Sequence, residues 1–194
     1  MSIDFAAQRA TMVESQVRVA DVTDYAIQDA MRVVAREALL PPATAYLAYA
    51  DVEVAWAPGR WLLKPRDIAK LLQALRPRPG ERALAIAAPY AAAVLAAMGL
   101  AVTRLDDGDL TDPSRDVFDG AWDVVVCEGA VSAVPPAWCD ALALNGRLGV
   151  VERHGPVGRA ELYLRSERDV GRRDLFDCAP PVMPGFEAAP AFTF

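Results

Sequence analysis

Histidine and cysteine are scarce in this 194-residue sequence, which holds one histidine, His154, and three cysteines, at positions 127, 139 and 178. A single histidine excludes a metal site built from several histidines. The cysteines are odd in number and form no C-x-x-C pair, so they outline neither a disulfide framework nor a redox motif. Cys127 has no evident partner base that would make it a nucleophile. His154 lies in a glycine-rich turn, which is typical of a surface loop.

An excess of basic residues is also missing, since the formal net charge is −6. This balance argues against nucleic acid as a partner, because a nucleic-acid interface needs a clustered basic face. Arg172 and Arg173 form a basic doublet, which we interpret as a solvated strand end. The first residues show neither a basic nor an apolar leader region, so we expect a cytoplasmic protein.

Charge is absent from one long stretch, Ala83 to Thr103, which is long enough to span a bilayer. The stretch is mostly alanine, and Pro89 and Gly99 divide it into three short pieces. We therefore favour a buried strand, a buried helix and a second buried strand over a membrane span. That succession is typical of a parallel sheet covered on both faces.

The remaining pattern predicts one α/β domain over residues 1–194, made of a helical extension with a hairpin (1–78) and a Rossmann-like core (79–194). Apolar spacing predicts a first helix, and Asp24 is expected to cap a second helix that runs to about Ala38. Ala57-Pro58-Gly59 is a turn signal within a hairpin that carries Trp56 and Trp61. Further elements are expected as follows: helices from Pro65, at 90–98 and at 136–144; strands at 82–87, 100–105, 122–127, 148–151, 160–165 and 173–176; a loop with one helical turn at 106–120; and a tight turn at Asn145-Gly146.

A strand, a turn, a helix and a second strand ending in an acid form the half-fold that binds nucleotide cofactors. Such a turn needs glycines, which let the ligand approach the backbone, and free N–H groups at the helix start. Here the turn is Ile86-Ala87-Ala88-Pro89-Tyr90, which has no glycine, and Pro89 removes one N–H donor. Asp106 follows the second strand, where it is either a ribose ligand or a polar strand end, and the altered turn favours the strand end.

Several segments, in order, resemble the protein-L-isoaspartate O-methyltransferase family, which uses S-adenosylmethionine (SAM). The resemblance covers most of the chain and implies a three-layer Rossmann-like methyltransferase fold. Its segments are 12–18, like the family's amino-terminal helix; 29–37, like "A-M-x-x-V-P-R-E" with Ala35 for proline; 48–51, like "A-Y-x-D"; 79–84 and 90–96, around the SAM turn; 122–126, like "F-D-x-I-x-V"; and 145–148, like "G-G-R-L".

The departures from the family fall on its functional positions. The SAM turn of the family resembles "E-I-G-x-G-[ST]-G-Y", whereas this chain has the shorter Ala85-Ile86-Ala87-Ala88-Pro89-Tyr90. Its substrate loop carries a hydroxyl in "T-[IV]-S-x-P", and Leu63 takes that position here. The segment from Asp106 to Trp122 is too short for the helix and strand that the family places there, which predicts a shortened sheet.

The resemblance and its departures together predict a catalytically degenerate member that binds no SAM and acts as a binding or assembly module. No residue is expected to be catalytic and none to bind metal. The degenerate cofactor positions are Ala85, Ala87, Ala88, Pro89, Tyr90 and Asp106, with Asp51 and Glu128 as possible cleft residues.

Two alternatives remain open: an active SAM-dependent carboxyl methyltransferase with a rebuilt loop, and a cleft that takes another small ligand near Asp106 and Glu128. A protein partner or a homodimer, through the hairpin or the helical extension, is expected in the favoured case, and the hairpin tryptophans are candidates for such an interface.

Overall fold

The computed structural model describes residues 3–188 and begins with a group of short helices. Helix α1, Phe5–Met12, continues through a π-helical turn, Val13–Val17, into a 3-10 turn, Arg18–Ala20. Helix α2, Tyr25–Val33, starts at the expected cap, where the Asp24 carboxylate accepts hydrogen bonds from the amides of Ala26 and Ile27. It ends at Val33 and not near Ala38, because Val34 is extended and two β-branched residues in succession weaken a helix.

The segment between α2 and the core contains two 3-10 turns, a hairpin and a long helix. The turns are Arg36–Leu39 and Ala45–Leu47. Strands β1, Val54–Ala57, and β2, Arg60–Leu62, form the expected hairpin, and Gly59 at φ 67° makes the turn between them. Helix α3, Pro65–Leu75, begins with proline at its first turn, as predicted. Trp56 and Trp61 are partly buried.

The main sheet has six strands in the order β4-β3-β5-β6-β7-β8. The first four are parallel to one another, whereas β7 runs antiparallel to β6 and β8 antiparallel to β7. The elements in chain order are β3 Arg82–Ile86, α4 Pro89–Ala97, β4 Ala101–Leu105, a 3-10 turn Asp116–Phe118, β5 Trp122–Val131, α5 Pro136–Asp140, β6 Leu142–His154, β7 Val157–Arg165 and β8 Val170–Asp177.

The charge-free stretch folds as strand, helix and strand, with one correction. Strand β3 is buried, but β4 lies at the edge of the sheet and exposes Ala101 and Thr103. Only β3 pairs with it among the described strands, so it has solvent on one side. Among residues 3–188, no helix is both long and apolar enough to cross a membrane.

The second correction concerns the segment before β6. Helix α5 ends at Asp140, short of the expected Leu144, and Asn145-Gly146 is an irregularity inside β6 and not a hairpin turn. The register against β5 shifts there, and Asn145 adopts a left-handed φ of 64°. Gly146 is required because a Cβ would lie 2.5 Å from the Trp122 carbonyl oxygen.

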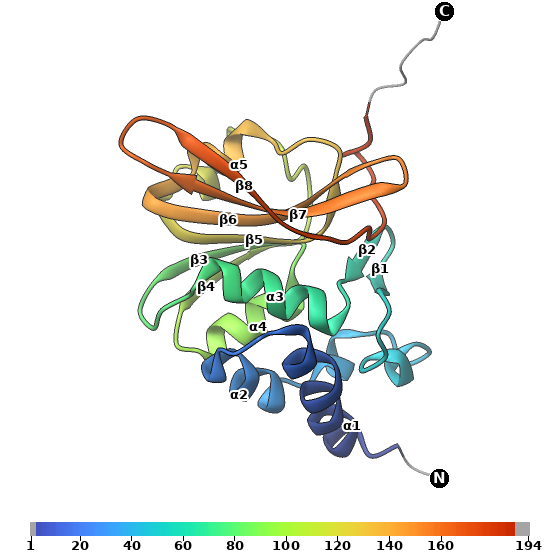
Figure 1. Ribbon diagram of the computed structural model, residues 1–194. Helices are drawn as coiled ribbons and strands as arrows, with labels where there is room; N and C mark the ends of the chain where they lie inside the picture. Colours follow the sequence, from blue (N-terminus) through green and yellow to red (C-terminus); the bar gives the residue numbers. More distant parts are fainter. Residues whose placement is uncertain (1–2, 189–194) are drawn as a thin grey trace, which may run out of the picture.

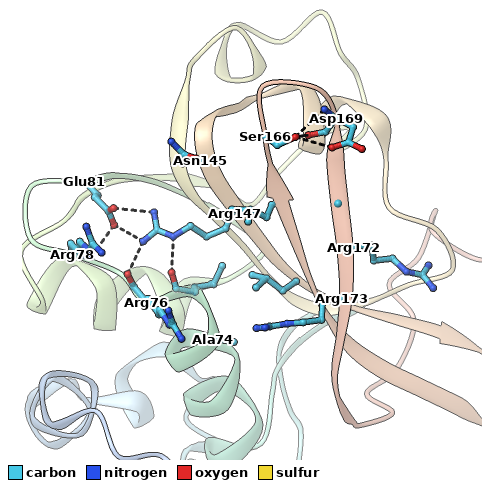
Figure 2. Close-up of a pocket in the computed structure, with 14 residues that line it drawn as sticks. Ala74, Arg76, Arg78, Glu81, Asn145, Arg147, Ser166, Asp169, Arg172 and Arg173 are labelled. Carbon is cyan, nitrogen blue, oxygen red and sulfur yellow. Dashed lines mark hydrogen bonds and ion pairs between the residues drawn. The ribbon is translucent and has the colours of Figure 1, made fainter.

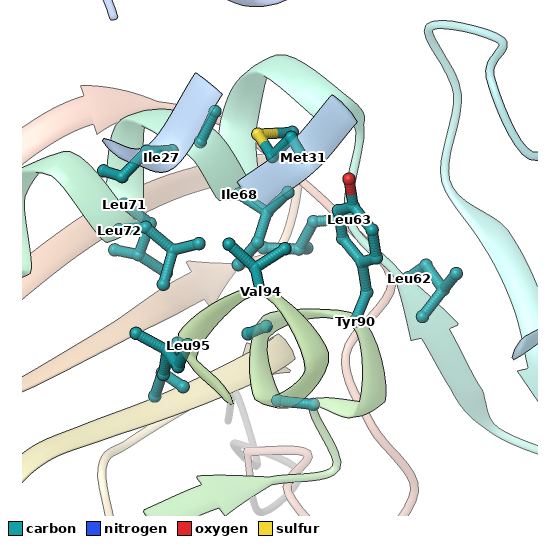
Figure 3. Packing of buried hydrophobic residues seen from close by; sticks show 14 of the residues in the cluster. Ile27, Met31, Leu62, Leu63, Ile68, Leu71, Leu72, Tyr90, Val94 and Leu95 are labelled. Atoms are coloured by element: carbon teal, nitrogen blue, oxygen red, sulfur yellow. The ribbon is translucent and has the colours of Figure 1, made fainter. Parts of the chain in front are cut away.

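The elements form three layers, with α2, α3 and α4 on one face of the sheet and α5 on the other (Figure 1). The larger hydrophobic cluster joins the amino-terminal helices to the sheet. Figure 3 shows Ile27 and Met31 of α2 above residues of α3, with Val94 and Leu95 of α4 below. The opposite face is covered by α5 and by the loops around Leu110 and Phe118. The Rossmann-like fold is therefore confirmed.

Candidate functional site

The turn between β3 and α4 is closed to solvent. Its backbone keeps a conformation that suits glycine, since Ala87 has a φ of 47°. A non-glycine residue held there costs about 1–2 kcal/mol. The other side chains of the turn are alanine, proline and tyrosine, and Ala85, Ile86, Ala87, Ala88, Pro89 and Tyr90 are all buried. The positions that would have to lie open for a cofactor are thus covered by protein atoms.

A carboxylate from the neighbouring strand occupies the start of α4. The Oε2 atom of Glu128 accepts hydrogen bonds from the amides of Tyr90 at 3.0 Å and Ala91 at 3.1 Å. Free amides at a helix start form an anion-binding site, and in Rossmann-like folds a ligand takes this place. In this chain an internal carboxylate satisfies them.

A bulge in β5 accompanies the placement of Glu128. The pairing of β5 with β6 shifts register between Val126 and Ala130, so the residues between them lie outside the regular ladder. Gly129 follows Glu128 with a φ of 152°, and a Cβ at this position would lie 2.8 Å from the Met183 side chain. The Cys127-Glu128-Gly129 segment therefore has a structural role inside a central strand, which continues to Val131.

A fully buried arginine lies close to this carboxylate. The Arg36 guanidinium donates to the carbonyl oxygen of Ala48 at 2.8 Å and to that of Leu63, and its carbon lies 4.6 Å from the centre of the Tyr90 ring. Within residues 3–188, Arg36 Nη1, Tyr90 Oη and Glu128 Oε1 are buried atoms without a hydrogen-bond partner. We call Arg36, Tyr90 and Glu128 the buried polar cluster.

Burial dominates the acid–base behaviour of the cluster. It raises the pKa of Glu128 to about 7, although Arg36 and the amides of Ala91, Tyr90 and Leu63 oppose this shift. Burial also raises the pKa of Tyr90 and lowers the pKa of Arg36. The protein interior therefore disfavours the charged form of each of these three side chains.

The structure brings together some of the residues expected from sequence and separates others. Two of the expected residues, Tyr90 and Glu128, belong to the buried polar cluster. A third, Leu63, contacts the cluster through its carbonyl oxygen, which accepts a hydrogen bond from Arg36. Asp106 pairs with Arg104 at 2.6 Å, and Asp51 lies at the surface, where it pairs with Arg66 at 3.3 Å. Asp51 lines a cavity of about 320 Å³ whose lining does not include Glu128.

Sequence reasoning missed Arg36 as a member of the site. The available signal was its place in the 29–37 segment, the one that resembles a family motif. The segment from Asp106 to Gly120 contains only the 3-10 turn Asp116–Phe118 as a helical element, so β4 remains the edge strand of the described sheet. No group of three or more histidine, cysteine or acidic side chains within residues 3–188 is placed to hold a metal ion.

The parallel strands, their covering helices and the position of the β3–α4 turn define the chain as a Rossmann-like methyltransferase fold. A crystal structure described as a putative protein-L-isoaspartate O-methyltransferase of Plasmodium falciparum in complex with S-adenosyl-L-homocysteine superimposes with a TM-score of 0.74 at 15% identity, over 90% of this chain and 97% of that one. No family model matches the sequence.

Curated relatives then identify the family. A protein-L-isoaspartate O-methyltransferase of Methylorubrum populi is 35% identical over 94% of this chain and 98% of its own length. Protein-L-isoaspartate O-methyltransferase 1 of Rhodopseudomonas palustris is 41% identical over 74% of this chain and 69% of its own length. The chain belongs to the protein-L-isoaspartate O-methyltransferase family, as the sequence motifs predicted.

Proposed function

We propose that this chain is a family member that has lost SAM binding and acts as a binding or assembly module. The observation that carries the proposal is the Glu128 carboxylate on the amides of Tyr90 and Ala91. An adenosyl cofactor would need the closed turn in front of these amides to open. In this arrangement the residues present do not fit the cofactor.

The energetics support the same conclusion. To admit a ligand at the start of α4, the chain would have to withdraw the carboxylate of Glu128 from its donors while it remains buried. A buried polar group left without its partner costs about 1–3 kcal/mol, and more if charged. The alanine and proline side chains of the turn would also have to move. Each loss of about 1.4 kcal/mol lowers affinity about tenfold, so a few such losses remove cofactor binding at cellular concentrations.

The module role draws support from the helical extension. Val19, Tyr25 and Val33 are 72%, 73% and 69% exposed, which is high for apolar and aromatic side chains on neighbouring helices. We expect these side chains to contact a protein partner or a second copy of the chain. Light scattering across a range of concentrations tests the second copy, with Tyr25→Asp as the variant that should weaken a dimer. A monomer at every concentration would remove the homodimer from the proposal.

Titration calorimetry with SAM and with S-adenosylhomocysteine tests the loss of cofactor binding. We expect no binding at millimolar ligand. The competing function, an active carboxyl methyltransferase, has the support of relatives that carry that name, and it predicts micromolar binding together with label transfer from SAM to an isoaspartyl peptide. That pair of results would overturn the proposal.

A further inference from the structure

A cavity of about 570 Å³ opens at the end of the sheet opposite the β3–α4 turn. It lies between the carboxyl end of α3, the segment before β3, and strands β6 to β8 (Figure 2). Five arginines line it, at positions 76, 78, 147, 172 and 173, against two acidic residues, Glu81 and Asp169. This local excess of positive charge contrasts with the net charge of −6 of the whole chain.

Arg147 forms the fixed wall of the cavity. Its guanidinium makes two bonds of 2.9 Å to the Glu81 carboxylate and donates to the carbonyl oxygens of Leu75 at 2.7 Å and Arg76 at 2.6 Å. Glu81 therefore balances the charge of Arg147, and Arg147 satisfies the last carbonyls of α3. Neither residue is free to bind a ligand, but together they hold the end of α3 in place.

Three other arginines of the lining have guanidinium groups without a partner in the described part of the chain. Within residues 3–188, the side chains of Arg76, Arg78 and Arg173 form neither a hydrogen bond nor an ion pair. Figure 2 shows Arg173 extending from β8 toward the end of α3, where Arg76 lies. The backbone of Arg76 is fixed, because this residue caps α3 in the left-handed conformation at φ 48°.

The remaining charges of the lining are engaged elsewhere. Arg172 points away from the cavity in Figure 2 and pairs with Glu161 at 3.1 Å. Asp169 lies in the turn between β7 and β8, where its carboxylate accepts a bond of 2.8 Å from the Ser166 hydroxyl. The doublet Arg172-Arg173 therefore divides between the two faces of β8. Of these two residues, Arg173 is the one that faces the cavity, and its guanidinium has no partner within residues 3–188.

We infer that this cavity binds a small polyanion that carries two or more phosphate or carboxylate groups. Guanidinium groups match the planar oxygen pairs of both anions, and they bind them by charge-assisted hydrogen bonds. The volume lies in the range of small-molecule sites, and Leu162 and Leu164 add an apolar wall. The inference is independent of the loss of SAM binding, because the two sites lie at opposite ends of the sheet.

Calorimetric titration of the full chain with pyrophosphate and, separately, with citrate tests the inference at low ionic strength. We expect at least one of these anions to bind and its affinity to fall as salt is added. Arg76→Gln and Arg173→Gln should each weaken binding by about tenfold, since each removes a charge-assisted contact. Arg168→Gln is the matched control: it removes an exposed arginine of the same hairpin that does not line the cavity, and affinity should be unchanged.

The comparison of the two probes distinguishes a phosphate ligand from a carboxylate ligand. Absence of binding by both anions to the wild-type chain would overturn the inference. Equal loss of affinity in Arg168→Gln and Arg173→Gln would overturn it too, because it would indicate general charge attraction and not a site. Thermal unfolding of each variant without ligand confirms that the fold is intact.

Discussion

At the scale of single residues, Glu128 is a fully buried acid that also stabilises the start of α4, where it accepts hydrogen bonds from two amides. Burial raises its pKa to about 7, above the usual value near 4.5. The folded state therefore holds a proton that the unfolded state releases between pH 4.5 and 7. By linkage, the contribution of Glu128 to stability is fully present below pH 4.5 and is lost as the pH rises through 7.

Glu128→Gln should remove this pH dependence, because an amide cannot ionise and its oxygen can still accept from Tyr90 and Ala91. Relative to wild type, we expect the variant to gain stability between about pH 5 and pH 8, by up to about 3 kcal/mol. Urea unfolding at a series of pH values measures the difference between the two proteins, in which the other titrating groups cancel. A constant difference across this range would show that Glu128 does not titrate there.

Arg36 provides a second test at this scale, since its guanidinium bridges two loop carbonyls inside the protein. Arg36→Met leaves the carbonyls of Ala48 and Leu63 without a donor, and we expect a loss of about 3 kcal/mol or more. Arg36→Lys should lose less, because one ammonium group can retain part of the bonding. The matched control is Arg32→Met, whose ion pairs with Glu14 and Asp29 lie at the surface and contribute less than about 1 kcal/mol. Equal losses at the two positions would contradict the role given to Arg36.

At the scale of elements, the packing of α3 on the sheet depends on Gly149 of β6. A Cβ at this position would lie 3.0 Å from side-chain carbons of Leu71 and Leu75 on α3. Gly149→Ala should therefore push α3 away from the sheet and destabilise the protein by about 1–3 kcal/mol. Gly171→Ala in β8 is the control, because nothing lies within 4 Å of the position that its methyl group would take, and we expect a change within about 0.5 kcal/mol. Chemical denaturation of the two variants measures the contrast, and equal stabilities would refute the close approach.

The elements that sequence predicted well are those whose signals are local. Proline at the start of α3 and aspartate before α2 each act within a few residues, and the charge-free stretch is continuous in the sequence, so their elements were found. The ends of β5 and β6 were missed, because Glu128 and Asn145 interrupt the apolar pattern that marked those strands. Both residues lie at or beside register shifts of the β5–β6 pair, and only the pairing partner shows that the strand continues through them.

The candidate site shows the same division between local and long-range information. Loss of the glycines in the turn was visible in the sequence, and so was an acid at position 128. The bond from that acid to the start of α4 was not, because it joins residues 37 and 38 positions apart. The burial of Arg36 was still harder to predict from the sequence, because an arginine is rarely buried. Its partners, the carbonyls of Ala48 and Leu63, also lie on separate loops.

At the scale of the whole molecule, the helical extension and the Rossmann-like core share one hydrophobic cluster. Met31 of α2, Leu72 of α3 and Leu95 of α4 belong to it, together with residues of β3 and β5. If the extension separated from the core, both parts would expose apolar faces, and neither has a second partner for them among the described residues. The extension and the core should therefore unfold together.

Equilibrium unfolding in urea tests this cooperativity, because the two parts carry different signals. The far-ultraviolet circular dichroism has a large contribution from helices α1 to α3 of the extension. In a variant with Trp56→Phe and Trp61→Phe, tryptophan fluorescence reports on the core alone, through Trp122 and Trp138. One cooperative unit requires coincident transitions with a single midpoint. A helical signal that is lost at lower urea than the fluorescence of the core would mean that the extension is a separate unit, and the shared cluster would then contribute little to holding the two parts together.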